Sequence, residues 1–145
     1  MRIIFGADHG GVELKDLLVK RLSENGYEVE DLGTHGTDSV DYPDFAKRTA
    51  EAVAADKDAK GILVCGTGIG MSIAANKVKG IYCAKVNNAE EGRLAAEHNH
   101  ANMLALGGRI TGPDLAYAAV KAWLKASHGG DRHQRRVDKI ISMES

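Results

Sequence analysis

The fold of this 145-residue chain is decided by the stretch Gly61-Ile62-Leu63-Val64-Cys65-Gly66-Thr67-Gly68-Ile69-Gly70. Residues 61–65 form a short apolar run that predicts a buried β-strand. Three alternating glycines follow at once, and residues 71–77 then predict a helix. A buried strand that enters a helix through a glycine loop is typical of an α/β protein with a parallel sheet.

Strand-like and helix-like segments alternate on both sides of this stretch. The other expected strands cover residues 2–6, 27–32, 81–86 and 103–106. The expected helices cover residues 12–25, 44–55, 71–77, 88–98, 113–127 and 131–142, with Asp44 as the N-cap of the second. We therefore expect one domain over residues 1–145, with a three-layer α/β/α Rossmann-like fold around a five-stranded, mainly parallel sheet.

The composition argues against several classes of protein. The formal net charge is −1, so no overall field attracts nucleic acid or an anionic membrane. No apolar run approaches the roughly 20 residues that span a bilayer, and no basic-then-apolar leader is visible. Cys65 and Cys83 alone build neither a disulfide framework nor a zinc ribbon. We expect a cytoplasmic protein without nucleic-acid or membrane partners.

Polar residues follow several of the expected strands. In open α/β folds, ligands bind at the carboxyl ends of the strands. This rule places Asp8-His9, residues 65–70, Asn87-Asn88 and residues 107–109 on one surface. We expect the functional site to lie there.

The glycine loop after Cys65 is the sharpest of these features. Its backbone N–H groups can approach a ligand closely, and the helix N-terminus that follows favours negative charge. The same field favours a thiolate at Cys65. Two alternatives remain open: a tight turn beside a small buried cysteine, and a nucleotide-binding loop. The spacing G-x-G-x-G differs from both the dinucleotide fingerprint and the P-loop.

Histidines and arginines supply further candidates, each with a structural alternative. Asp8 and His9 can bind sugar hydroxyls and a phosphate, or Asp8 can cap the next helix. His98 can act as a general acid or base, or it can favour a helix C-terminus electrostatically. Arg132 and Arg136 share one helical face, and such arginines bind phosphate or form a solvated basic surface.

Seven separated blocks of this sequence resemble the type B ribose-5-phosphate isomerases of the ribose/galactose-6-phosphate isomerase family. The blocks are Asp8-His9-Gly10-Gly11, Asp41-Tyr42-Pro43, Cys65-Gly66-Thr67-Gly68-Ile69-Gly70, Ala74-Ala75-Asn76-Lys77, His98-Asn99, Gly108-Arg109 and Arg132-His133-Gln134-Arg135-Arg136. They occur in the family's order, and the resemblance runs essentially from end to end.

The resemblance implies an aldose–ketose isomerase of the pentose phosphate pathway that interconverts D-ribose 5-phosphate and D-ribulose 5-phosphate through an enediolate. It implies that Cys65 is the base, that Thr67 assists it and that His98 opens the sugar ring. The implied substrate-binding residues are Asp8, His9, Tyr42, Gly66, Gly68, Ile69, Gly70, Asn99, Arg109, Arg132 and Arg136. We expect no metal and no organic cofactor, because a thiolate can move a proton without either.

The resemblance also implies a homodimer or a dimer of dimers, with active sites shared between subunits. One branch of the family places a glutamate at the position of Met71, which cannot act as a base, so proton transfer falls to Cys65. His100 stands where many members have Asp or Asn. Two alternatives remain: isomerisation of a six-carbon sugar (allose 6-phosphate, galactose 6-phosphate, free psicose or free allose), and a non-catalytic sugar-phosphate sensor.

Overall fold

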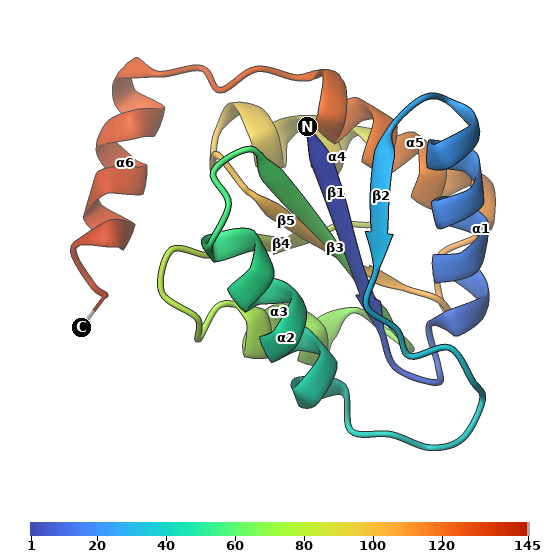
Figure 1. Cartoon of the computed structure of the whole chain (residues 1–145). Helices are drawn as coiled ribbons and strands as arrows, with labels where there is room; N and C mark the ends of the chain where they lie inside the picture. Colours follow the sequence, from blue (N-terminus) through green and yellow to red (C-terminus); the bar gives the residue numbers. More distant parts are fainter. Residues whose placement is uncertain (145) are drawn as a thin grey trace.

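Five strands form a central parallel sheet in a computed structural model that describes residues 1–144 (Figure 1). In spatial order the strands are β2 (Glu28–Asp31), β1 (Arg2–Ala7), β3 (Ala59–Cys65), β5 (Met103–Gly107) and β4 (Cys83–Lys85). Each neighbouring pair is parallel, so the sheet is parallel throughout and not only mainly so. The expected α/β class is confirmed.

Helices cover both faces of the sheet because alternate strand residues bury their side chains on opposite faces. Ile3 and Phe5 pack in one core, whereas Ile4 packs in the other. The first core also contains residues of α1 (Val12–Glu24), α4 (Ala89–Glu97) and α5 (Pro113–Lys125). The second contains residues of α2 (Tyr42–Ala54) and α3 (Ile69–Ala75). These two cores make the three layers of the fold.

Two helices begin earlier than expected. The N-cap of α2 is Asp41, and Pro43 lies in the first turn, so the assignment of Asp44 as the N-cap is wrong. Proline is tolerated in a first turn because its missing N–H has no intrahelical acceptor there, and the Asp44 carboxylate suits that positive end. The start of α3 at Ile69 makes Ile69 and Gly70 part of the helix.

The last helix, α6 (Asp131–Ile141), stands apart from the three layers and follows an extended segment after α5 (Figure 1). Val137 is its buried residue. Beyond the helix, Glu144 Oε1 accepts hydrogen bonds from Gly80 N–H at 3.2 Å and Tyr82 O–H at 3.0 Å. Burial, followed by this bond and the charge of Glu144, raises the pKa of Tyr82 to about 12. Glu144 thus connects the segment after α6 to the loop before β4.

None of the helices formed by residues 1–144 has the length and apolarity that a bilayer crossing requires.

Candidate active site

Loops from three neighbouring strands meet where the strands end, an edge called here the carboxyl edge. Cys65 ends β3 and lies opposite Gly107 of β5. Asp8 N–H donates to Val64 O at 3.2 Å, Gly108 N–H to Cys65 O at 2.7 Å, and Arg109 N–H to Gly66 O at 3.0 Å. These bonds join the residues after β1, β3 and β5 into one surface, as the topology rule predicts.

The Cys65 thiol lies inside this surface, with only 5% of the residue exposed. Gly68 N–H donates to Cys65 Sγ at 3.1 Å. The backbone of the glycine loop therefore contacts the sulfur atom directly. Gly68 has a φ of 82°, and a Cβ there would lie 3.0 Å from the backbone of Leu106, so only glycine fits without strain.

Thr67 continues the loop as an exposed residue. Its Oγ1 accepts a hydrogen bond from Ile69 N–H at 3.2 Å, which leaves its own O–H able to donate to a ligand. As the second and third residues of α3, Gly70 and Met71 contribute N–H groups that have no partner inside an α-helix. The loop therefore presents both a hydroxyl and backbone donors beside Cys65.

Two side chains flank the loop. A Cβ at Gly66 would lie 3.4 Å from both Cδ and Nη1 of Arg109, so the guanidinium lies against the loop. A Cβ at Gly70 would lie 2.5 Å from Tyr42 Cε1, so that ring covers Gly70. The structure thus brings Tyr42 and Arg109, both candidates from the sequence, to the two sides of the glycine loop.

Asp8 does not cap α1, because the N-cap of that helix is Gly11. Instead, Asp8 Oδ1 accepts a hydrogen bond from Gly10 N–H at 2.9 Å, and the residue is largely buried. A Cβ at Gly11 would lie 2.2 Å from Val64 O, so the glycine permits close approach of this turn to β3. The capping alternative for Asp8 is therefore wrong, and the carboxylate stays beside the loop.

His9 lies next to Asp8 with a fixed tautomer in its neutral form. Val40 N–H donates to His9 Nδ1 at 3.2 Å, which leaves Nε2 as the protonated nitrogen. His9 and Arg109 line a cavity of about 430 Å³ together with Thr111 and the first turns of α1. This cavity offers an imidazole N–H and a guanidinium to an anion, an arrangement suited to a phosphate.

His98, Asn99, Arg132 and Arg136 are not brought to Cys65 within one chain. His98 is the C-cap of α4 and precedes β5, whose first residue Met103 lies opposite Gly61. These residues belong to the amino edge, where the strands begin. At about 3.3 Å per residue, the four steps along β5 separate the two edges by about 13 Å.

At the amino edge, His98 and three residues of α6 form a group that we call the histidine–arginine cluster: His98, Arg132, His133 and Arg136. The His98 and His133 rings stack with centroids 4.1 Å apart. Arg132 and Arg136 are exposed, and neither joins a salt bridge within residues 1–144. The cluster is a second cationic surface with capacity for an anion.

His133 was not singled out from the sequence, although it stands in the Arg132-to-Arg136 block. Partial burial lowers its pKa, and the charges of His98, Arg132 and Arg136, with that of His128, lower it further. Its i, i+3 spacing to Arg136 was the available signal, because residues three apart share a helical face.

The remaining polar candidates have structural partners. Asn88 caps α4 by accepting from Glu91 N–H at 2.8 Å, and Asn87 Oδ1 accepts from Lys85 Nζ at 2.6 Å. Burial raises the pKa of the Cys83 thiol to about 12, so this second cysteine stays protonated. Among residues 1–144, no three His, Cys, Asp or Glu side chains gather in a way that could hold a metal ion.

The chain belongs to the Ribose/Galactose Isomerase family, whose model matches residues 3–140, and is therefore a sugar-phosphate isomerase. Within this family, the chain is 46% identical over 143 residues to ribose-5-phosphate isomerase B of Escherichia coli (strain K12), covering 99% of this chain and 96% of that protein.

Two solved structures are also similar to this chain. Ribose-5-phosphate isomerase B of Clostridium thermocellum superimposes with a TM-score of 0.97 at 53% identity, covering 99% of this chain and 97% of that one. The enzyme of Mycoplasma genitalium, solved with bound ribulose-5-phosphate, gives a TM-score of 0.96 at 42% identity, covering 99% and 95%. The expected family and enzyme class are confirmed.

Proposed function

We propose that this protein interconverts D-ribose 5-phosphate and D-ribulose 5-phosphate through an enediolate, as a step of the pentose phosphate pathway. The observation that carries the proposal is the Cys65 thiol on the glycine loop, with Gly68 N–H donating to its sulfur at 3.1 Å. Further support comes from the Mycoplasma genitalium relative, which binds ribulose-5-phosphate.

In the proposed reaction, the Cys65 thiolate removes the proton from C2 of the open-chain aldose. The C–H electron pair forms the C1=C2 double bond, and the carbonyl π electrons move to O1. Cys65 then returns its proton to C1, while the O2 proton passes to O1 and the carbonyl re-forms at C2. The exposed Thr67 hydroxyl, on the loop that follows Cys65, is suited to hydrogen bond near O1 and O2 during this exchange.

The glycine loop stabilises the negative charge that develops on O1. The N–H groups of Gly70 and Met71, at the start of α3, are donors of the kind that form an oxyanion hole. One such donor is worth about 3 kcal/mol in the transition state. Asp8 beside the loop is suited to accept from a sugar hydroxyl.

The substrate phosphate binds between two copies of the chain in this proposal. His9 and Arg109 line the cavity at the carboxyl edge of one copy. The histidine–arginine cluster of the second copy supplies Arg132 and Arg136, with His98 protonating the ring oxygen and Asn99 contacting a hydroxyl. The support is that the cluster lies at the opposite edge from Cys65 and that both arginines are exposed.

Exposed apolar side chains near the loop support such a homodimer. Ile69 and Ile73, four residues apart on α3, are 54% and 59% exposed, and Ile110 beside Gly107 is 57% exposed. A second copy that contributes its histidine–arginine cluster to this site would cover these side chains. A dimer of dimers would repeat the same contact.

The experiment follows ribulose 5-phosphate formation from ribose 5-phosphate by chelator-treated protein. We expect turnover in the wild type and a loss of at least about 100-fold in kcat for Cys65→Ala, the usual worth of a positioned base. Cys83→Ala is the matched control and should keep its activity. Full activity in Cys65→Ala would contradict the mechanism, and loss of activity on chelation would contradict metal-free catalysis.

The same assay identifies the preferred sugar substrate. We expect kcat/KM to be highest for ribose 5-phosphate when it is compared with allose 6-phosphate, galactose 6-phosphate and free allose or psicose. A higher value for a six-carbon sugar would overturn the substrate assignment but leave the mechanism standing. Binding of ribose 5-phosphate without turnover would instead indicate a sensor.

A further inference from the structure

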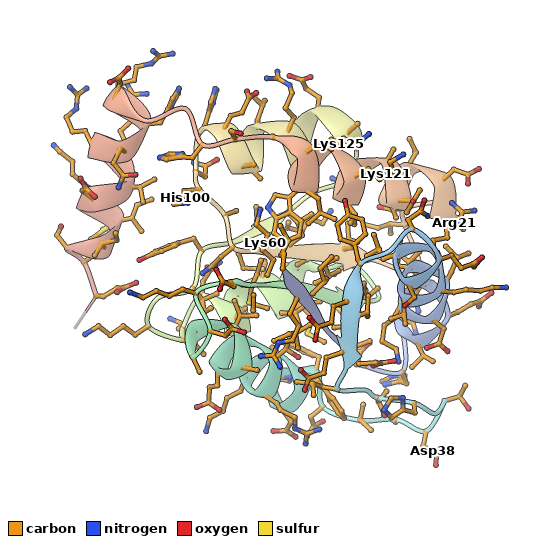
Figure 2. All side chains as sticks on the ribbon, turned by 45° about the horizontal axis from the view of Figure 1, so that its top comes forward. Arg21, Asp38, Lys60, His100, Lys121 and Lys125 are labelled. Carbon is orange, nitrogen blue, oxygen red and sulfur yellow. The ribbon has the colours of Figure 1, made fainter. Side chains whose placement is uncertain are left out.

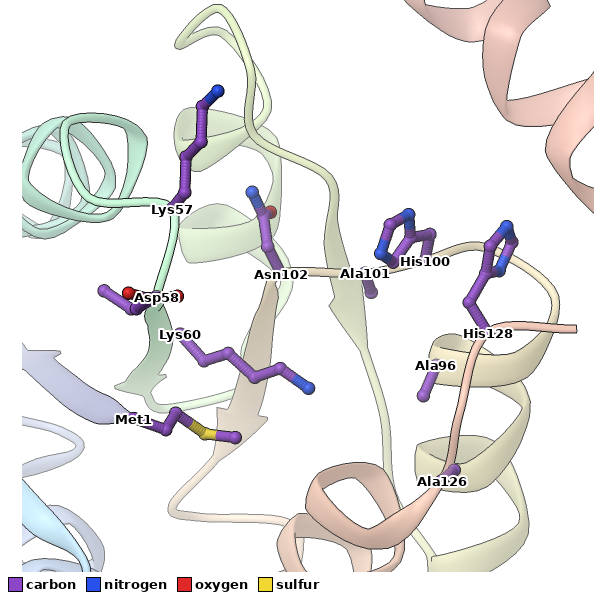
Figure 3. Close-up of a pocket in the computed structure, with 11 residues that line it drawn as sticks. Met1, Lys57, Asp58, Lys60, Ala96, His100, Ala101, Asn102, Ala126 and His128 are labelled. Atoms are coloured by element: carbon purple, nitrogen blue, oxygen red, sulfur yellow. The ribbon is translucent and has the colours of Figure 1, made fainter. Parts of the chain in front are cut away.

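The amino edge holds a cavity of about 400 Å³ that the proposed reaction does not use (Figure 3). Its lining comes from the starts of β1, β3 and β5 and from the ends of α4 and α5, and it includes Met1, Lys57, Lys60, His100, Asn102 and His128. Asp58 is its acidic lining residue. Cationic side chains therefore outnumber anionic ones around this space.

Lys60 is the central cation of the cavity. Its side chain is partly buried, and Figure 3 shows it extending from β3 into the space between Met1 and Ala96. The ammonium lies 4.8 Å from the centroid of the Trp123 ring, and no salt bridge within residues 1–144 involves it. Burial lowers its pKa. A partly desolvated cation without a carboxylate partner is stabilised when an anion binds beside it.

Hydrogen bonds hold His128 in place at the cavity wall. Its Nδ1 lies 3.1 Å from Glu97 O and its Nε2 lies 2.9 Å from Gln134 Oε1. Gln134 is oriented by its own Nε2, which donates to Asp138 Oδ1 at 2.7 Å. Both ring nitrogens therefore have partners within the chain, and these contacts hold the ring at the wall of the cavity.

His100 completes the wall on that side. It stacks on His128 with centroids 4.4 Å apart, and its backbone is left-handed with a φ of 50°. Burial lowers its pKa, as do the charges of His128 and Lys60. An anion in the cavity would offset these two charges, so binding would favour proton uptake by His100. Lys57 and Asp58 are the other charged side chains that line the cavity.

The two lysines of the cavity are not needed as donors to the carbonyl groups at the end of α4. Leu94 O accepts from His98 N–H at 2.8 Å, Ala95 O from Ala101 N–H at 3.0 Å, and Glu97 O from Gly129 N–H at 2.8 Å. Because backbone donors already occupy these carbonyls, Lys57 and Lys60 remain available to a ligand.

We propose that this cavity binds a small phosphate dianion, either inorganic phosphate or the phosphoryl group of a monoester. Lys60 supplies the charge from inside, and Lys57 supplies it from the rim. The cavity lining contains none of the residues of the proposed active site, although His128 lies near the histidine–arginine cluster that the proposed function assigns to a neighbouring copy's site. His128 also bonds to Gln134 of α6, so a bound anion would hold α6 against the end of α4.

The test titrates the full-length protein with inorganic phosphate and follows the Cε1–H resonances of its six histidines by NMR. We expect the resonances of His100 and His128 to shift along one saturating curve. Lys60→Gln should weaken this binding at least about tenfold, because a charge-assisted contact is lost. Lys57→Gln, at an exposed position that folding does not require, should weaken it by about threefold or more.

Lys125→Gln is the matched control. It makes the same charge change on α5, outside the cavity lining, and should leave the affinity unchanged (Figure 2). Shifts confined to His9, His98 and His133 would mean that phosphate binds only at the proposed active site and would overturn the proposal, as would equal affinity in Lys60→Gln. A parallel titration with methyl phosphate separates the sources: equal affinity indicates recognition of the dianion alone, and tighter binding indicates a monoester.

Discussion

Gly68 links backbone conformation to chemistry at the scale of a single residue. Its left-handed φ of 82° accompanies the hydrogen bond from its N–H to Cys65 Sγ. Gly26 offers a comparison, because its φ of 88° is similar but a Cβ there would meet nothing within 4 Å. Comparing the same substitution at the two glycines therefore separates the cost of backbone strain from the effect on the thiol.

We predict that Gly68→Ala and Gly26→Ala each lower the free energy of unfolding by about 1 kcal/mol or more, because alanine is strained at a positive φ. Only Gly68→Ala should also lower kcat/KM, since its Cβ crowds Leu106 and displaces the donor to Cys65. Urea unfolding and the isomerase assay measure the two effects. Equal activity of the two variants would show that Gly68 serves only the turn.

Several site residues could be predicted from the sequence because they follow strand ends. Asp8, Cys65 and Arg109 meet at the carboxyl edge as the parallel topology requires. The place of Tyr42 over Gly70 depends on where α2 begins, which the sequence assigned two residues too late. The His98–His133 stack depends on the path of the segment before α6, which no local pattern encodes.

At the scale of elements, α4 and α6 meet through histidines. His98 and His133 stack at the end of α4, and His100 and His128 stack beside them. Protonating both members of a stacked pair places two positive charges side by side, close to Arg132 and Arg136. This contact is therefore sensitive to pH in a direction that the pKa shifts define.

The pKa values of His133 and His100 lie below the ordinary 6.5 in the folded chain, chiefly because of burial. Below pH 6.5 the unfolded chain therefore binds more protons than the folded chain does. The free energy of unfolding decreases as the pH falls through that range and keeps its full value above it. We predict that the free energy of unfolding decreases between pH 7 and 5.5, and that His133→Asn reduces this decrease.

Histidine Cε1–H titrations by NMR check the same prediction directly. In the native protein, the resonances of His133 and His100 should titrate below 6.5, whereas in urea both should approach this value. Native titration of both at or above 6.5 would contradict the assigned environment.

The order of strands and helices could be read from hydrophobic periodicity, since five strands and six helices form where alternation was expected. The helix boundaries were harder to predict, because the first turn of a helix tolerates residues that are unfavourable in a helix interior. Pro43 lies in the first turn of α2, and Gly70 is the second residue of α3.

At the scale of the whole molecule, the residues of the proposed site lie on opposite edges of the sheet. The helix α4 runs back from the carboxyl edge, so the residues at its end return to the amino edge. The proposed function therefore needs a second copy, in which the histidine–arginine cluster of one chain meets Cys65 of the other. A closed dimer would hold two such sites.

We predict that Cys65→Ala and His98→Asn, each nearly inactive alone, regain activity when the two are unfolded and refolded together. Half of the dimers are then mixed, and each mixed dimer has one site with both intact residues, so about a quarter of wild-type activity should return. Refolding each variant by itself is the control. A mixture no more active than the separate variants would contradict sites shared between subunits.

The central claim is that the Cys65 thiol carries the proton between C2 and C1. The most direct measurement follows ribose 5-phosphate by NMR in D₂O, with wild-type, Cys65→Ala and Cys83→Ala proteins. A proton carried by a thiol exchanges with solvent, so wild-type and Cys83→Ala proteins should place deuterium at C1 of ribulose 5-phosphate. Cys65→Ala should incorporate it at least about 100-fold more slowly. Incorporation by Cys65→Ala at the wild-type rate would contradict the assignment.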